Sequence, residues 1–139
     1  MKTQAALLTV LLLAGTGLAQ AAPKTHLTMD HSTASLMDKP TAAALWHQHL
    51  TARVVKLYPV AKWGFISQVE GGFDMNKVCV LTARAMMVPR SGKNLLFVPT
   101  QSATTFATQA GATAEQCRAL AKTKLDEAIV AVRSSLLKD

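Results

Sequence analysis

The two cysteines of this chain, Cys79 and Cys117, restrict its possible folds more than any other pair of residues. The N-terminus resembles that of an exported protein, and an even cysteine count in such a chain predicts a disulfide. An intramolecular bridge would close a loop of about 40 residues and stabilise the fold by roughly 4 kcal/mol, less any native strain. No CxxC motif is present, so we predict a structural bridge and not a redox site.

The first 21 residues have the features of a signal peptide. Lys2 supplies a positive charge, residues 5–13 are apolar apart from Thr9, and Ala19-Gln20-Ala21 has the small-x-small pattern of a cleavage site. The apolar run is too short to span a bilayer as a helix. We therefore predict that residues 1–21 are removed, that the mature chain has no transmembrane segment, and that it is periplasmic or secreted.

The composition predicts a folded, basic domain. The chain has 15 Lys and Arg against 8 Asp and Glu, a net charge of +7, and 50% hydrophobic residues. This composition excludes a disordered, highly charged chain, and the roughly 118 residues left after cleavage fit one domain. A basic exported chain suits an anionic partner, and we favour a protein with an acidic surface. The cations form no run and few aromatic residues lie among them, so we do not expect nucleic acid.

Hydrophobic spacing predicts two helices. Residues 22–38 show no hydrophobic period, which indicates a flexible N-terminal segment before a single domain of residues 39–139. Asp38-Lys39-Pro40 is a helix start, and the helical pattern continues to residue 57, before Tyr58-Pro59 ends it. A capping-box sequence, Thr113 to Gln116, starts a final helix.

The chain between these helices predicts a sheet. Turn signals at Gly71-Gly72 and in the 89–94 segment separate three expected strands, which are residues 61–70, 77–88 and 95–106. Pro99 cannot donate a ladder hydrogen bond, so the third strand should be an edge strand or carry a bulge. The predicted fold is α+β: a helix, a three-stranded antiparallel meander, and a C-terminal helix packed on the sheet by one disulfide. We expect the first helix to cover the sheet face opposite that helix or, failing that, a partner to do so.

The four histidines are the residues best suited to bind a metal or act as a base. His47 and His49 are two apart in a helical pattern, so their side chains should diverge. His26 and His31 flank Asp30 in the N-terminal segment and form a weak set for copper or nickel. We assign all four histidines to exposed positions and predict no metal and no cofactor.

No motif in the sequence requires catalysis. The GxSxG, GxGxxG and GxxxxGK[ST] patterns are absent, which leaves catalytic activity open and favours a non-catalytic role. One alternative is a small hydrolase or ligand-binding enzyme that uses His47 or His49 with a nearby carboxylate. A second alternative is a structural accessory of an envelope complex.

The turn at residues 89–94 is the most suggestive binding feature. Arg90 and Lys93 flank a Ser91-Gly92 turn, Asn94 follows, and apolar segments lie on both sides. A stiff tip with two cations loses little entropy on docking and suits an acidic cleft. We predict a small exported non-catalytic binding protein of inhibitor or immunity type, which masks another envelope or secreted enzyme or toxin through Arg90, Ser91, Lys93 and Asn94.

Overall fold

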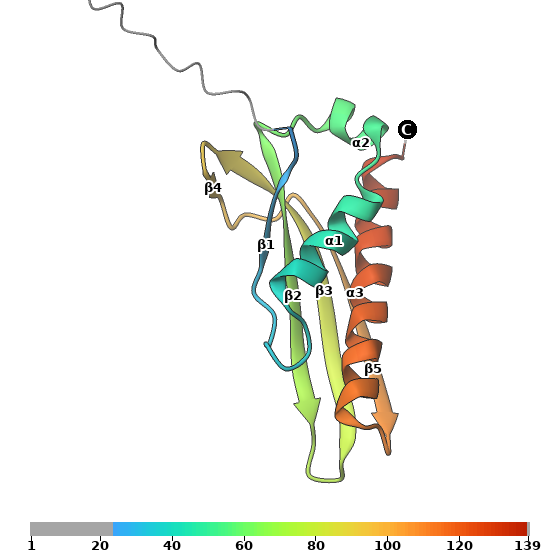
Figure 1. Cartoon of the computed structure of the whole chain (residues 1–139). Coiled ribbons are helices and arrows are strands. Elements are labelled where there is room, and N and C mark those ends of the chain that lie inside the picture. The colour runs from blue at the N-terminus through green and yellow to red at the C-terminus, as the bar shows by residue number, and fades with distance from the viewer. Residues whose placement is uncertain (1–23, 139) are drawn as a thin grey trace, which may run out of the picture.

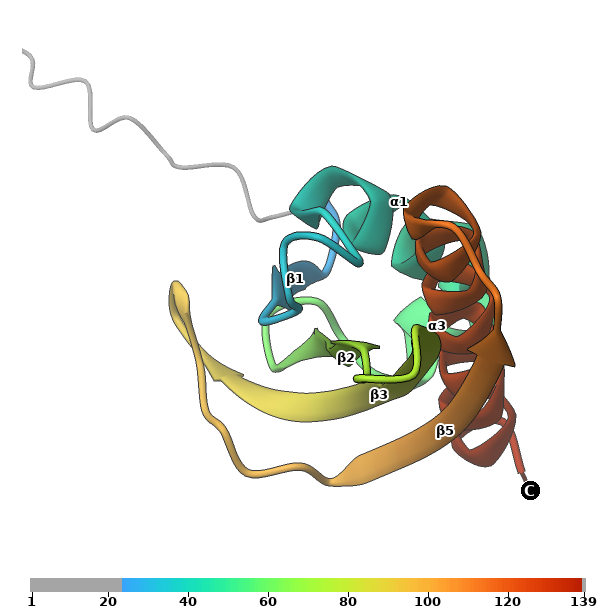
Figure 2. The same ribbon diagram turned by 90° about the horizontal axis from the view of Figure 1, so that it is seen from below.

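The computed structural model describes residues 24–138 and shows a curled mixed sheet with helices on its concave side (Figures 1 and 2). The predicted signal peptide lies outside the described residues. The elements in chain order are β1 Leu27–Asp30, α1 Lys39–His49, α2 Ala52–Leu57, β2 Trp63–Phe73, β3 Val78–Ser91, β4 Asn94–Leu95, β5 Gln101–Ala110 and α3 Ala114–Leu136. Among residues 24–138, no helix has the length and apolar character needed to cross a bilayer.

Strand β3 lies at the centre of the sheet. It pairs antiparallel with β2 on one side and with β5 on the other, as the sequence predicts. Within the described part of the chain the sheet nevertheless has five strands and is mixed, so the three-stranded meander is incomplete. The strand β1 pairs in parallel with β2 and lies within the N-terminal segment predicted to be flexible. Its four residues are too few to show a hydrophobic period, and a parallel pairing leaves no local signal.

The helix ends follow the capping signals in the sequence. The Asp38 carboxylate accepts hydrogen bonds from the Thr41 N–H at 2.8 Å and from its hydroxyl at 2.9 Å, which starts α1. Both hydrogen bonds of the predicted capping box are present between Thr113 and Gln116 at the start of α3. The single helix predicted for residues 39–57 is interrupted at Leu50 and forms two helices, α1 and α2.

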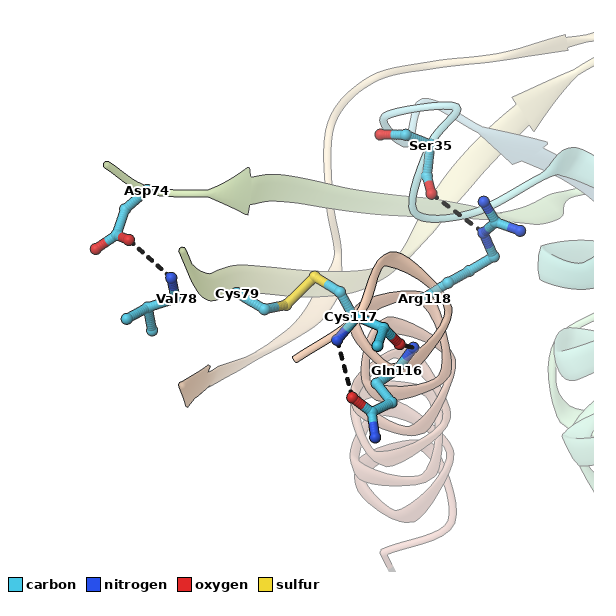
Figure 3. Close-up of a disulfide and its surroundings, with 8 residues drawn as sticks. Ser35, Asp74, Val78, Cys79, Gln116, Cys117 and Arg118 are labelled. Atoms are coloured by element: carbon cyan, nitrogen blue, oxygen red, sulfur yellow. Dashed lines mark hydrogen bonds between the residues drawn. A yellow bond between two sulfur atoms is a disulfide. The ribbon is translucent and has the colours of Figure 1, made fainter. Parts of the chain in front are cut away.

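The core lies between the concave face of the sheet and the helices. The odd-numbered residues of β3 from Cys79 to Met87 are buried there, and α3 presents its buried stripe to them. Cys79, at the start of β3, bonds to Cys117, in the first turn of α3, with a Cα–Cα distance of 5.7 Å (Figure 3). The disulfide prediction is therefore confirmed, and Ala83 and Ala85 provide the small surface on which α3 packs.

The prediction that the first helix covers the opposite face is wrong. The ring centroids of Trp46 in α1 and Phe65 lie 4.5 Å apart, and the Trp46 indole N–H donates to the buried Ser67 hydroxyl at 2.8 Å. Helix α1 therefore packs on the same face of the sheet as α3. The convex face has its own cluster, in which Leu95 packs against three buried residues, Ile66, Met86 and Val88. The chain itself covers this part of the convex face, through residues 94–100.

Residues 91–100, which we call the crossover arm, connect β3 to β5 across the convex side of the sheet (Figure 2). The strand predicted for residues 95–106 is therefore split between β4 and β5, and Pro99 lies between the two. Gly64 of β2 lies under the arm, since a Cβ atom there would be 2.3 Å from Leu95 Cδ2. Glycine at this position allows the arm to lie close to the sheet.

The predicted turn at Gly71-Gly72 is part of β2 instead. Gly71 has φ 136°, and a Cβ atom there would lie 2.1 Å from the Val80 carbonyl oxygen. Glycine therefore serves close strand approach at this point. The turn itself occupies residues 74–77, where the Asp74 carboxylate accepts a hydrogen bond from the Val78 N–H at 2.8 Å (Figure 3).

Candidate functional site

The tip of the β3–β4 hairpin presents most of the residues predicted to bind a partner. Ser91, Lys93 and Asn94 are exposed, and Gly92 takes the left-handed conformation, φ 59°, that the turn requires. Ser91 pairs with Asn94, so the tip continues the sheet. Figure 1 shows this hairpin projecting on the side of the molecule away from α3. These three side chains are therefore accessible to a partner.

Arg90, the fourth predicted residue, holds the hairpin tip in place. Its Nη1 donates to the Val60 carbonyl at 2.9 Å and its Nε donates to the Gly92 carbonyl at 2.7 Å. Its backbone N–H donates to the Lys62 carbonyl at 2.7 Å. Arg90 therefore ties the tip to the loop that follows α2, and we assign it a positioning role. The exposed cations of this region are Lys62 and Lys93.

Three consecutive apolar residues after the tip are exposed, which the sequence did not predict. Leu96, Phe97 and Val98 are 47%, 57% and 67% exposed. Two backbone hydrogen bonds hold the chain on either side of them. The Leu96 N–H donates to the Pro89 carbonyl and the Thr100 N–H donates to the Met87 carbonyl, both at 2.9 Å. The run resembles a buried strand in sequence, and Pro99 was the one sign that it would leave the ladder.

The charged residues in the sequence segments that form this region are Lys and Arg, and Asp30 of the nearby β1 lies on the concave face. No Asp or Glu occurs between Met75 and Ala114, nor between Lys39 and Val69. Glu70 and Asp74 lie toward the other end of the sheet, because β2 pairs with the tip region at its start and with Cys79 at its end. We call the combined apolar run and its cationic rim the arm surface, which consists of Lys62, Ser91, Lys93, Asn94, Leu96, Phe97 and Val98.

His49 makes the contact that the enzyme alternative requires, but its ring is fully engaged. Its Nε2 is 2.7 Å from Asp126 Oδ1 and its Nδ1 is 3.4 Å from Arg133 Nη1. The adjoining groove has a volume of about 500 Å³, and the one hydroxyl in its lining, that of Thr123, donates to the Ala119 carbonyl at 3.2 Å. Neither ring nitrogen is left to activate that hydroxyl. His49 therefore clamps the end of α1 onto α3. His47 is exposed.

His26 is buried and the His49 side chain is only 13% exposed, so the expectation that all four histidines are exposed is wrong for these two. His26 is 4% exposed, its Nε2 lies 2.7 Å from the Tyr58 carbonyl oxygen, and its ring contacts Phe65 edge-on at 5.1 Å. Burial lowers the pKa of His26 below its usual value, against the opposing effect of the hydrogen bond to Tyr58. A neutral imidazole that donates to Tyr58 fits this environment.

The weak metal set considered for the N-terminal segment is not assembled. Asp30 is in register with Ser67 on the concave face, and its carboxylate accepts a hydrogen bond from the Ser32 hydroxyl at 2.6 Å. His26 is buried, whereas His31 is exposed. Within residues 24–138, no cluster of three or more His, Cys, Asp or Glu residues is suited to a metal ion.

A cavity of about 400 Å³ opens between β1 and the start of α1. Trp46 and Ser67 line it and are bonded to each other, and Asp30 is bonded to Ser32. No buried side-chain nitrogen or oxygen of the described residues lacks a partner. The cavity therefore offers a ligand no unpaired buried group, and we assign it none.

Comparisons with known proteins reveal no relative. No family model matches the chain, and neither the curated proteins nor the solved structures contain a significant match. Any functional proposal therefore depends on the residues and geometry described above.

Proposed function

We propose that this chain is a small exported non-catalytic binding protein, of inhibitor or immunity type. The arm surface would dock into an apolar cleft with an acidic rim on another envelope or secreted protein, an enzyme or a toxin, and mask it. One observation carries the proposal: three consecutive apolar side chains, Leu96 to Val98, stand exposed on a backbone that is hydrogen-bonded on both sides.

The arm surface has the composition of a protein–protein interface. Burying its three apolar side chains would contribute roughly 2–5 kcal/mol, because full burial of one contributes about 1.5–3 kcal/mol and each is about half exposed. An apolar centre inside a polar rim is the usual interface arrangement. The rim cations Lys62 and Lys93 would accelerate encounter with an acidic partner and exclude basic ones.

Preorganisation supports the same proposal. Arg90 bridges the tip to the Val60 carbonyl, and Leu95 anchors the arm on the convex cluster. A surface already fixed in its bound shape loses little conformational entropy on docking. The Cys79–Cys117 disulfide supports an oxidising compartment, so we place both protein and partner in the periplasm or outside the cell.

The two alternatives have less support. A hydrolase that uses His49 would need a free ring nitrogen, and both nitrogens face charged neighbours, Asp126 and Arg133. A structural accessory of an envelope complex would use the same arm surface for assembly instead of inhibition. The identity and activity of the partner separate inhibition from assembly.

A photo-crosslinking residue at position 97 tests the proposal. Incubation with envelope extract should give one discrete protein adduct, which excess unmodified protein competes away and which Lys93→Glu or high salt reduces. The matched control places the crosslinker at Phe106, which is 62% exposed on β5. The same adducts from both positions, or adducts that resist competition, would contradict the assignment of the arm surface.

A further inference from the structure

Met29 and His31 place two metal ligands, a soft thioether and an imidazole, together on the convex face, beside the arm surface. The Met29 sulfur lies 3.1 Å from His31 Nε2. The backbone fixes both positions, since Met29 is in register with Ile66 of β2 and the His31 N–H donates to the Ser67 carbonyl at 2.9 Å. His31 directly follows β1 and continues its pairing with β2, and residues two apart along an extended chain share a face, so the fold itself brings thioether and imidazole together.

We propose that Met29 and His31 bind a soft monovalent cation, Cu(I), for which Ag(I) is a suitable probe. A thioether selects Cu(I) over harder ions, and a neutral imidazole suits copper as well. The nearest carboxylate along the strand, that of Asp30, is on the other face and bonded to Ser32, so it does not add a hard ligand. A monovalent ion also adds less charge than a divalent one to a chain of net charge +7.

The observed separation accommodates an ion after a small movement. With metal–nitrogen and metal–sulfur bonds of about 2.0 and 2.3 Å, ligand atoms 3.1 Å apart correspond to a bond angle near 90°. Opening that angle to about 120°, the trigonal value with one water as the third ligand, needs a separation of roughly 3.7 Å by the same bond lengths. His31 is exposed and Met29 is 39% exposed, so both side chains have room for this change.

Phe97 gives the pair an apolar neighbour. Its ring centroid lies 5.8 Å from that of His31, with the rings at 75°. The phenyl group shields one side of the imidazole from water, which disfavours strongly hydrated cations such as Mg²⁺ that keep their water ligands. The combination of a thioether, an imidazole and an aromatic neighbour therefore matches a weakly hydrated ion.

Calorimetric titration of the purified, disulfide-bonded protein with Ag(I), and competition for Cu(I) against a chromogenic chelator, test the site. We expect one equivalent to bind, and Met29→Leu and His31→Gln each to weaken binding by more than roughly tenfold, since even outer-shell partners are worth 10- to 100-fold. Met75→Leu and His47→Gln remove an exposed thioether and an exposed imidazole elsewhere and should leave the affinity unchanged.

The expected NMR signature is a shift of the Met29 methyl resonance on addition of Ag(I), with Met75 unaffected. Thermal melting of each variant separates loss of the site from loss of the fold. Equal Ag(I) affinity for wild type and Met29→Leu, or equal losses in the Met75→Leu control, would overturn the proposal. Tighter binding of Zn²⁺ than of Ag(I) would also overturn it, because it would assign the site to harder ligands.

Discussion

Gly64→Ala tests the placement of the crossover arm, because the sequence alone predicts that this change stabilises the protein, whereas the structure predicts that it destabilises it. Replacing a glycine by alanine where the backbone permits it usually stabilises a protein by about 0.4–1 kcal/mol, through the unfolded state. In the folded structure the added Cβ would lie 2.3 Å from Leu95 Cδ2 and 2.8 Å from the Leu27 carbonyl oxygen. The Leu95 side chain can rotate, but the Leu27 backbone must shift. Overpacking of this kind costs roughly 1–3 kcal/mol, so we expect net destabilisation.

Urea denaturation of the oxidised protein provides the measurement, with the midpoint compared at constant m-value. In a Leu95→Ala background, Gly64→Ala should cost less than it does in the wild type, because the nearer of the two contacts is already gone and only the one to Leu27 remains. A coupling energy above about 0.5 kcal/mol between the two sites would confirm direct contact. A stabilised Gly64→Ala variant, or strictly additive effects, would refute the packing of the arm over β2.

Three further measurements test other parts of the structure. Reduction of the Cys79–Cys117 bridge should cost roughly 4 kcal/mol of unfolding free energy, and equal denaturation midpoints with and without reductant would contradict this. His26 has its pKa lowered from 6.5, so the unfolded chain binds more protons below that value. Its contribution to stability should be complete above about pH 6.5 and decline as the pH falls, and His26→Gln should lack this slope between pH 7.5 and 5. Trp46→Phe should cost about 1–3 kcal/mol, because it leaves the buried Ser67 hydroxyl without its donor, and a Ser67→Ala background should reduce that cost.

Local signals in the sequence identified the elements whose determinants are local. The capping box at Thr113 and the Asp38 cap depend on residues three apart, and both are present. The bridge between Cys79 and Cys117 followed from counting, because two cysteines allow one intramolecular pairing. The long strand β3 was also predictable, because the apolar residues that indicate a strand lie within β3 itself.

Features that depend on distant contacts were missed. Strand β1 exists through its parallel pairing with β2, more than 30 residues away, and four residues show no period. Gly71 resembled a turn residue, whereas the need for glycine comes from the Val80 carbonyl of the neighbouring strand. The cover of the convex face around Ile66, Met86 and Val88 came from the crossover arm, and no helical pattern indicates such a crossing.

The candidate site also combines features that local sequence predicts with features that depend on distant contacts. The exposure of Ser91, Lys93 and Asn94 followed from a polar turn between apolar segments. The internal bonds of Arg90 involve Val60, thirty residues away, and have no sequence signature. The pairing of Met29 with His31 would have been apparent only if β1 had been recognised as a strand, since two residues of separation then place both side chains on one face.

Backbone dynamics of the free protein test most directly whether the arm surface is preformed. Order parameters for the amides of Leu96, Phe97 and Val98 can be measured by ¹⁵N relaxation without any partner. Hydrogen bonding at Leu96 and Thr100 predicts values near the 0.85 or so of rigid backbone. Values below about 0.6 would show a flexible loop, and the proposal of a preorganised docking surface would then be wrong.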